Sequence, residues 1–369
     1  MDPFDASTLP GLPAPFWFVE LFKVLGFTLH MVPMHLWYAG AVLALGLYAW
    51  GGRHEKRFGA RLMLQMPVLV ALGINLGIVP LLFLQVGYSR AFYPATILMA
   101  WFWLAIVGLL IPAYYGVYLY AFGLRDEGVA MTPIRRAAGW GAAAMFLAIG
   151  FLFANGLSLT GNPGAWPKLW QAHSFGGAAT GTALNLADAT LWPRWLLMFG
   201  LALVTTAAWA VVDAAWLAPR EGPEYRRGVQ VLSGRVALAG SVWATIAGAW
   251  YVVVWPKATT SAMLGFPTVL LTLLTAASPW LPAALLWLGR RAELSRRRAA
   301  AIVAAQLAVL ALNAVSRQIV QNVEVHRLYD VSAQPTAVQW GPMALFLVTL
   351  LAGAAVVGWI LAQVLKARS

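Results

Sequence analysis

The sequence predicts an all-helical integral membrane protein that crosses the bilayer many times. Hydrophobic residues make up 61% of the 369 residues and charged residues only 10%, whereas a soluble domain carries roughly 25% charged residues. The basic residues recur in every second connection between apolar stretches, which is typical of loops retained on the cytoplasmic side. Five regions hold 18 of the 25 Lys and Arg residues: Arg53/Lys56/Arg57/Arg61, Arg125/Arg135/Arg136, Arg220/Arg226/Arg227/Arg235, Arg290 to Arg298, and Lys366/Arg368.

Stretches of roughly 20 apolar residues predict nine spans within one membrane domain, 1–369. An odd number of spans and the basic pattern place the N-terminus outside and the C-terminus in the cytoplasm, as expected for a multi-pass protein of a bacterial inner membrane. Residues 13–23 are expected to form an interfacial segment before the first span. The longest outer connections are predicted at 160–193 and 322–339. The spans lie near 22–50, 65–88, 95–123, 138–158, 192–217, 235–255, 266–289, 299–321 and 341–365.

Composition excludes several classes of protein. The net charge of +12 lies in short loops beside apolar spans, so it indicates topology and contact with anionic membrane lipids rather than nucleic-acid binding. The chain has no cysteine, which excludes disulfides, iron–sulfur clusters and covalently attached c-type haem. The first 15 residues lack a basic segment followed by an apolar core, so no cleaved signal peptide is expected.

Two histidines in the first span are the leading candidates for chemistry at membrane depth. His30 and His35 are five residues apart, which turns a helix by about 140°. The two imidazoles therefore cannot hold one metal ion from the same face. Each is expected to serve a different cofactor or partner helix, either as an axial haem ligand or as a hydrogen-bonded structural histidine.

Other polar residues are weaker candidates. His173 and His326 lie in the two longest outer connections, where each could cap a haem edge or face water. Arg317, on one helical face with Gln321, could pair with a haem propionate or extend to the interface. Asp213, near the cytoplasmic end of the fifth span, is expected to be solvated.

Four short segments resemble subunit I of cytochrome bd oxidase. The resemblance covers most of the chain, and the segments occur in the family's order. Gly73 to Tyr88 resembles its second span and following outer turn, and Phe151 to Gly156 its fourth-span A-N-G/S segment. Pro193 to Leu196 resembles the start of its fifth span, and Ser261 to Gly265 its R-x-M-x-G segment.

The resemblance implies two four-helix bundles, 22–158 and 192–321, with 341–365 as a peripheral ninth helix. It implies b-type haem in the first bundle, with His30 or His35 as axial ligand of the haem iron. Met263 matches a methionine ligand. The family's fifth-span histidine falls at Leu197 or Met198, so that ligand is missing here, and Met198 stands as a candidate in its place.

Two further departures bear on activity. The family's third-span glutamates fall near Trp103 and Ile111, and its long quinol loop is reduced to about a dozen residues around Lys257. A complete oxygen reductase needs proton-accepting groups within the membrane. The chain is therefore expected to be a component of an oxidoreductase complex rather than a complete oxygen reductase.

Three functions remain open from the sequence. The first is a bd-like electron-transfer subunit of the respiratory chain that binds haem b, with a quinone as a second candidate cofactor. It would pass electrons between the quinone pool and an outer redox partner, such as a periplasmic c-type cytochrome or an iron–sulfur protein. The second is a haem-free scaffold that anchors other respiratory-complex subunits. The third is a transporter or channel, although neither midplane ion ligands nor an inverted repeat is evident.

Overall fold

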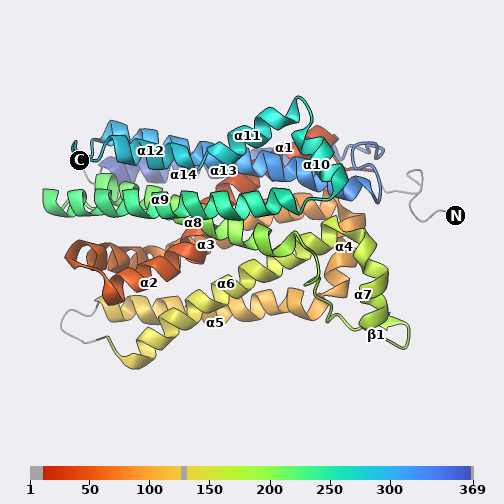
Figure 1. Cartoon of the computed structure of the whole chain (residues 1–369), viewed down its shortest axis with the longest axis horizontal. Coiled ribbons are helices and arrows are strands. Elements are labelled where there is room, and N and C mark those ends of the chain that lie inside the picture. Colours follow the sequence, from red (N-terminus) through yellow and green to blue (C-terminus); the bar gives the residue numbers. More distant parts are fainter. Residues whose placement is uncertain (1–10, 126–130, 367–369) are drawn as a thin grey trace.

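The computed structural model describes residues 11–125 and 131–366, and 82% of the structure is helical. Long helices run side by side along the longest axis of the molecule (Figure 1). The helical elements are α1 (Phe16–His35), η2 (Leu36–Gly40), α2 (Ala41–Trp50), α3 (Arg53–Gly87), α4 (Ser89–Leu98), α5 (Ala100–Arg125), α6 (Pro133–Gly161), η3 (Pro163–Ala165), α7 (Trp166–Ala172), α8 (Leu191–Val212), η4 (Asp213–Leu217), α9 (Pro223–Val253), α10 (Lys257–Leu264), α11 (Thr268–Ala277), α12 (Trp280–Leu288), α13 (Arg296–His326) and α14 (Trp340–Lys366).

Within the described residues, seven helices are long and apolar enough to cross a membrane. The chain is therefore a multi-pass membrane protein, as its composition predicts. The seven are Phe16–Trp50, Arg53–Gly87, Ala100–Arg125, Pro133–Gly161, Leu191–Leu217, Pro223–Val253 and Arg296–His326. They coincide with seven of the nine predicted spans.

The connections between these helices gather at two ends of the molecule. We call the end with the turns 51–52, 218–222 and 289–295 the basic end, because three of the predicted basic clusters flank these turns. The opposite end, here the loop end, carries α4, α7 and α10 and the long connections 162–190 and 327–339 (Figure 1). Arg368 of the last basic cluster lies outside the described residues.

The first long helix corrects one sequence expectation. Residues 16–23, predicted as a segment that precedes the first span, are the beginning of α1 itself, and Lys23 is buried. The helix continues through the π-helical segment η2 into α2. At Gly40, within η2, a side chain would approach Thr206 Oγ1 of α8 to 3.0 Å. The glycine therefore allows α1 and α8 to pack closely.

The seventh predicted span, 266–289, is not one helix. It consists of two short helices, α11 and α12, interrupted at Ser278 and Pro279. Proline ends helical hydrogen bonding because it has no N–H and clashes with the preceding turn. The buried Ser241 hydroxyl of α9 donates to the Pro279 carbonyl at 2.7 Å, which satisfies a polar group at the break. The preceding pair, α10 and α11, is bent by 90°.

Small residues allow the long helices to approach one another. In α8, a side chain at Gly200 would lie 2.7 Å from Ala244 N, so the backbones of α8 and α9 are in contact there. Such contacts matter in lipid, where hydrophobicity does not drive helix association. Ala142 and Ala143 of α6 are buried, whereas 352–355 in α14 are exposed. The largest buried cluster joins η2, α2, α3, α5 and α6 to α8, η4 and α9.

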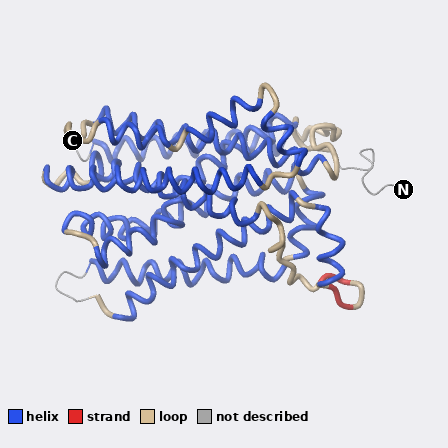
Figure 2. Tube along the Cα trace, viewed as in Figure 1, coloured by secondary structure: helices blue, strands red, loops and turns tan. Residues whose placement is uncertain are grey.

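The expectation of a fold with no sheet is wrong in one small detail. Two antiparallel two-residue strands, β1 (Ser174–Phe175) and β2 (Ala178–Ala179), pair in the long 162–190 connection (Figure 2, red). Gly176 and Gly177 have positive φ values of 58° and 81° in the turn between them, a conformation that glycine adopts without strain. The hairpin lies at the loop end, away from the body of the helices.

Candidate functional site

His30 of α1 is oriented by the helix beside it. Its Nδ1 lies 2.9 Å from the carbonyl oxygen of Gly73 in α3. A carbonyl only accepts hydrogen bonds, so Nδ1 carries the proton and the neutral ring leaves a lone pair on Nε2. At Gly77, a Cβ atom would approach His30 Cε1 to 2.8 Å. Gly77 thus makes room for this imidazole, whereas a side chain at Gly73 would approach Trp37 Nε1 to 3.1 Å.

His35 faces a different helix. Its Nδ1 lies 2.7 Å from Thr205 Oγ1 in α8. That hydroxyl donates to the Leu201 carbonyl at 3.1 Å and accepts from Gln306 Nε2 at 2.8 Å, so His35 Nδ1 is the donor. His35 is fully buried, and its Nε2 has no hydrogen-bond partner among the described residues. The prediction that the two imidazoles serve different helices is confirmed.

The two candidate methionines lie on different elements. Met198 of α8 is partly buried in a cluster with Met34, Tyr38 and Ala39, and it precedes Thr205 by two helical turns. It therefore lies on the side of α8 that faces α1. Met263 is buried in α10, where its carbonyl accepts from Thr272 Oγ1 at 2.8 Å. Among the described residues, no hydrogen bond joins Met263 to either histidine.

Polar side chains line the contact between α1 and α13 near the loop end. Lys23 is 7% exposed; its Nζ donates to Gln321 Oε1 at 2.6 Å and lies 3.9 Å from the ring centre of Tyr88. One turn deeper, the Arg317 guanidinium lies 4.0 Å from the ring centre of Phe27. Arg317 is thus partly buried against α1.

A hydrogen-bonded cluster continues from Lys23 toward the loop end. Gln318 Nε2 donates to Tyr88 Oη at 2.6 Å and to Glu20 Oε1 at 3.2 Å. Asn322 also donates to Glu20 and accepts from Tyr88. The cluster joins α1 and α13 to the end of α3, and it uses the Glu20 carboxylate as its common acceptor.

A second buried cluster fixes the long 162–190 connection. Asn155 Oδ1, at 0% exposure in α6, accepts from Asn185 N at 3.2 Å, and Ser158 Oγ donates to Asp188 Oδ2 at 2.5 Å. Next to this, Arg194 of α8 donates to Glu324 of α13 at 2.8 Å. The connection is thereby tied to α6, and the Arg194–Glu324 pair joins α8 to α13 beside it.

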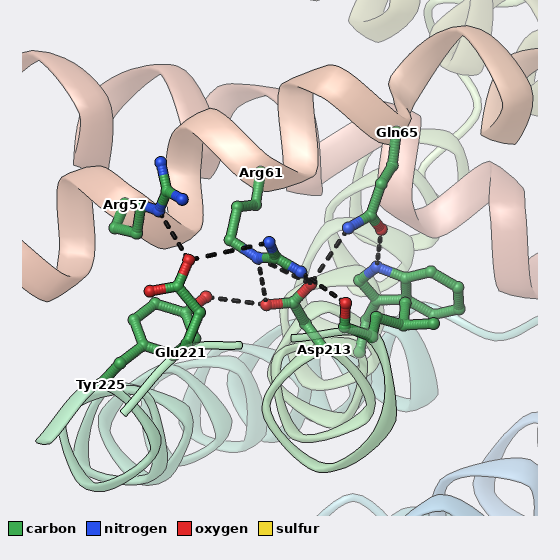
Figure 3. A network of polar contacts seen from close by, with 8 residues as sticks. Arg57, Arg61, Gln65, Asp213, Glu221 and Tyr225 are labelled. Atoms are coloured by element: carbon green, nitrogen blue, oxygen red, sulfur yellow. Dashed lines mark hydrogen bonds and ion pairs between the residues drawn. The ribbon is translucent and has the colours of Figure 1, made fainter. Parts of the chain in front are cut away.

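Asp213 requires a correction. It was expected to be solvated, but it is fully buried at the basic end, where it accepts from Arg61, Gln65 and Tyr225 (Figure 3). Arg61 Nε and Nη2 approach the carboxylate at 2.9 Å each, and Nη2 also donates to the Leu217 carbonyl at 2.9 Å. Sequence hydropathy places Asp213 at a helix end but does not reveal the arginine one helix away.

His173 lies in the 162–190 connection, as predicted, whereas His326 is the last residue of α13 rather than part of a connection. His173 Nδ1 is 3.2 Å from Thr182 Oγ1 next to the hairpin. His326 is exposed and lies 4.0 Å from Asp330, whose carboxylate accepts from Ser332 and has a pKa below its ordinary value because of that bond. Both residues are separated in the structure from the partners of His30 and His35.

Comparison with protein-family models and with curated proteins gave no match for this chain.

The α1–α13 contact contains functional candidates that the sequence did not single out. From the sequence, Lys23 and Glu20 were expected in an interfacial segment, and Tyr88 in an outer turn. One signal was available: Glu20, Lys23, Phe27 and His30 follow spacings of three and four residues, which place them on one helical face. That face is the one that meets α3 and α13 in the structure.

Proposed function

We propose that the protein is a membrane electron-transfer subunit, similar to subunit I of cytochrome bd oxidase, that binds haem b through His30. The observation that carries this proposal is the orientation of the His30 ring. Its Nδ1–H is held by the Gly73 carbonyl, and a ligating histidine usually donates its second ring N–H in this way. This hydrogen bond fixes the orientation of the ring and leaves Nε2 as the nitrogen that could bind the haem iron.

The surroundings of His30 fit an axial ligand. The ring is half-buried between α1 and α3, in contact with the glycines of the segment that resembles the bd family. Haem b would supply a one-electron carrier at this depth. His35 is the competing ligand: its Nε2 is also free, but it lies in a fully packed interior.

The topology and partners extend this proposal. Nine spans would form two four-helix bundles, 22–158 and 192–321, with 341–365 peripheral, and the basic end would face the cytoplasm of a bacterial cell. The loop end would then face outward, where the ordered 162–190 and 327–339 connections could dock a c-type cytochrome or an iron–sulfur protein. A quinone from the membrane pool would be the other redox partner.

A haem-free scaffold is the second candidate function. The packing of His35 favours it, because that ring is hydrogen-bonded to Thr205 and fully buried by the protein itself. In this alternative, both histidines only join α1 to its neighbouring helices. The role in a respiratory complex would then be to anchor other subunits.

The absorption spectrum of the purified, dithionite-reduced protein tests the two functions. We expect a b-type α-band from protein produced with full haem supply, and its loss in His30→Ala but not in the surface control His326→Ala. Loss in His35→Ala alone would transfer the ligand role to His35. A wild-type protein without any haem would contradict the proposed function and leave the scaffold.

A further inference from the structure

The contact between α1 and α13 brings hydrogen-bond donors together without matching acceptors. Two pairs of residues connect the helices: Lys23 donates a hydrogen bond to Gln321, and the Arg317 guanidinium lies over the Phe27 ring. Lys23 and Phe27 are four residues apart on α1, and Arg317 and Gln321 are four apart on α13, so the two pairs are one helical turn apart. The two cations therefore lie next to each other along the same contact.

Each of these donors has unused capacity. An ammonium group has three N–H donors, and among the described residues Lys23 Nζ has one hydrogen-bond acceptor, Gln321 Oε1. Gln321 is 9% exposed, and its Nε2 is buried with no partner in the described part of the chain. Arg317 contacts the Phe27 ring but forms no ion pair or hydrogen bond with any described residue.

The nearby carboxylates are already engaged elsewhere. Glu20 accepts from Gln318 and Asn322, and among the described residues it forms no ion pair with Lys23. Glu324 is paired with Arg194 at 2.8 Å. Neither carboxylate neutralises Lys23 or Arg317 by direct contact. Two like charges in a medium of low dielectric constant repel each other strongly unless an anion lies between them.

We propose that Lys23, Arg317 and Gln321 form a binding site for one anionic group, a carboxylate or a phosphate, between α1 and α13. Lys23 and Arg317 would supply the positive charge, and the free Gln321 Nε2 would supply a neutral donor. Two sources present this chemistry at such a depth. One is a carboxylate of a haem, which rests on the proposed function, and the other is the phosphate of a membrane lipid, which does not.

The Gln321→Glu variant tests the site directly. Glutamate has nearly the shape of glutamine, keeps the Oε1 that accepts from Lys23, and places a carboxylate where the unpaired Nε2 now lies. We expect this built-in carboxylate to displace the bound anion, and to raise the melting temperature of ligand-depleted protein by a few degrees. Lys257→Met, which removes an exposed lysine of α10 at the same end, is the matched control and should change neither property.

The bound group is measured on extensively delipidated protein, as haem by the pyridine haemochrome and as lipid phosphorus by mass spectrometry. We expect about one anion-bearing molecule per wild-type chain and at least a fivefold loss in Gln321→Glu and in Arg317→Met, with retention in Arg317→Lys. Haem without phosphorus identifies the carboxylate source, and phosphorus without haem identifies the lipid. Arg317→Lys and Gln321→Glu preserve charge or shape, so the test remains available where Arg317→Met does not fold.

Two results would overturn the site. One is a wild-type protein that retains neither haem nor anionic lipid; the other is a Gln321→Glu protein that retains the anion fully and melts at a lower temperature. Failure of the anion site can be distinguished from failure of the proposed function. Haem retained equally by all variants would leave the electron-transfer proposal standing and remove the anion site, whereas lipid phosphorus without haem would do the reverse.

Discussion

The basic-end network around Asp213 and the α1–α13 contact both bury charges, but they differ in how those charges are paired. Asp213 accepts from three residues of two neighbouring elements, and its principal partner Arg61 also reaches the Leu217 carbonyl. Every oxygen of that carboxylate is used. At the α1–α13 contact, Arg317 has only an aromatic ring and Gln321 Nε2 has nothing among the described residues.

The difference separates a structural connection, in which every charge is paired, from a contact that retains unused donors. A buried ion pair whose lone pairs and protons are all satisfied fixes the helices that carry it, here α3, η4 and α9. A buried donor without an acceptor is costly, so a native structure that retains one usually uses it. Substitutions that remove a charge or add a methyl group in each region test this difference through the free energy of unfolding.

The largest expected effect comes from Asp213→Asn. The substitution keeps the shape but leaves the Arg61 guanidinium, whose side chain is 20% exposed, without its principal anion. Breaking a buried pair by removing one partner costs about 3–5 kcal/mol. We expect this loss in the free energy of unfolding measured in mixed SDS–detergent micelles.

Arg57→Gln is the matched control for that prediction. Arg57 pairs with Glu221 at 2.8 Å, but its side chain is 60% exposed, and exposed pairs contribute about 0–1 kcal/mol. An Asp213→Asn protein as stable as Arg57→Gln would show that the basic-end network does not hold the helices together.

A smaller effect is expected from Gly77→Ala in α3, next to His30. The new Cβ would lie 2.8 Å from His30 Cε1, so the ring or helix α1 must shift, at a cost of about 1–3 kcal/mol. The same micelle titration measures the loss, and the α-band of any bound haem should shift with the ring. Gly108→Ala, where nothing lies within 4 Å, should be neutral or stabilising by up to about 1 kcal/mol; equal losses in both variants would contradict the close contact.

The smallest effect is expected from Arg317→Met in protein depleted of haem and lipid. No carboxylate is paired with Arg317 among the described residues, so its removal leaves no buried partner charge behind. We expect the free energy of unfolding to change by less than about 1 kcal/mol, in either direction, because the large cost of a broken buried pair comes from the partner that remains. A loss as large as that of Asp213→Asn would mean that Arg317 is already paired, and the contrast between the two regions would disappear.

Much of the fold was predictable from residue order. Apolar stretches predicted seven of the long helices, because each must satisfy its own backbone within lipid and therefore needs a continuous run of suitable length. The run at 266–289 misled the prediction: hydropathy is insensitive to the break at Ser278 and Pro279, although the prolines were visible. The short hairpin at Ser174–Ala179 depends on two glycines in a loop that hydropathy leaves featureless.

By itself, the sequence determined that this is a helical multi-pass membrane protein, and that His30 and His35 face different helices. Both follow from local rules, the length of apolar runs and the 3.6-residue helical period. Only the tertiary structure decided that Asp213 is buried beside Arg61 and that Lys23 donates to Gln321. It also decided that His30 donates to the Gly73 carbonyl and packs against Gly77. Those contacts join residues far apart in the chain, and their partners are chosen by helix packing, which no local pattern encodes.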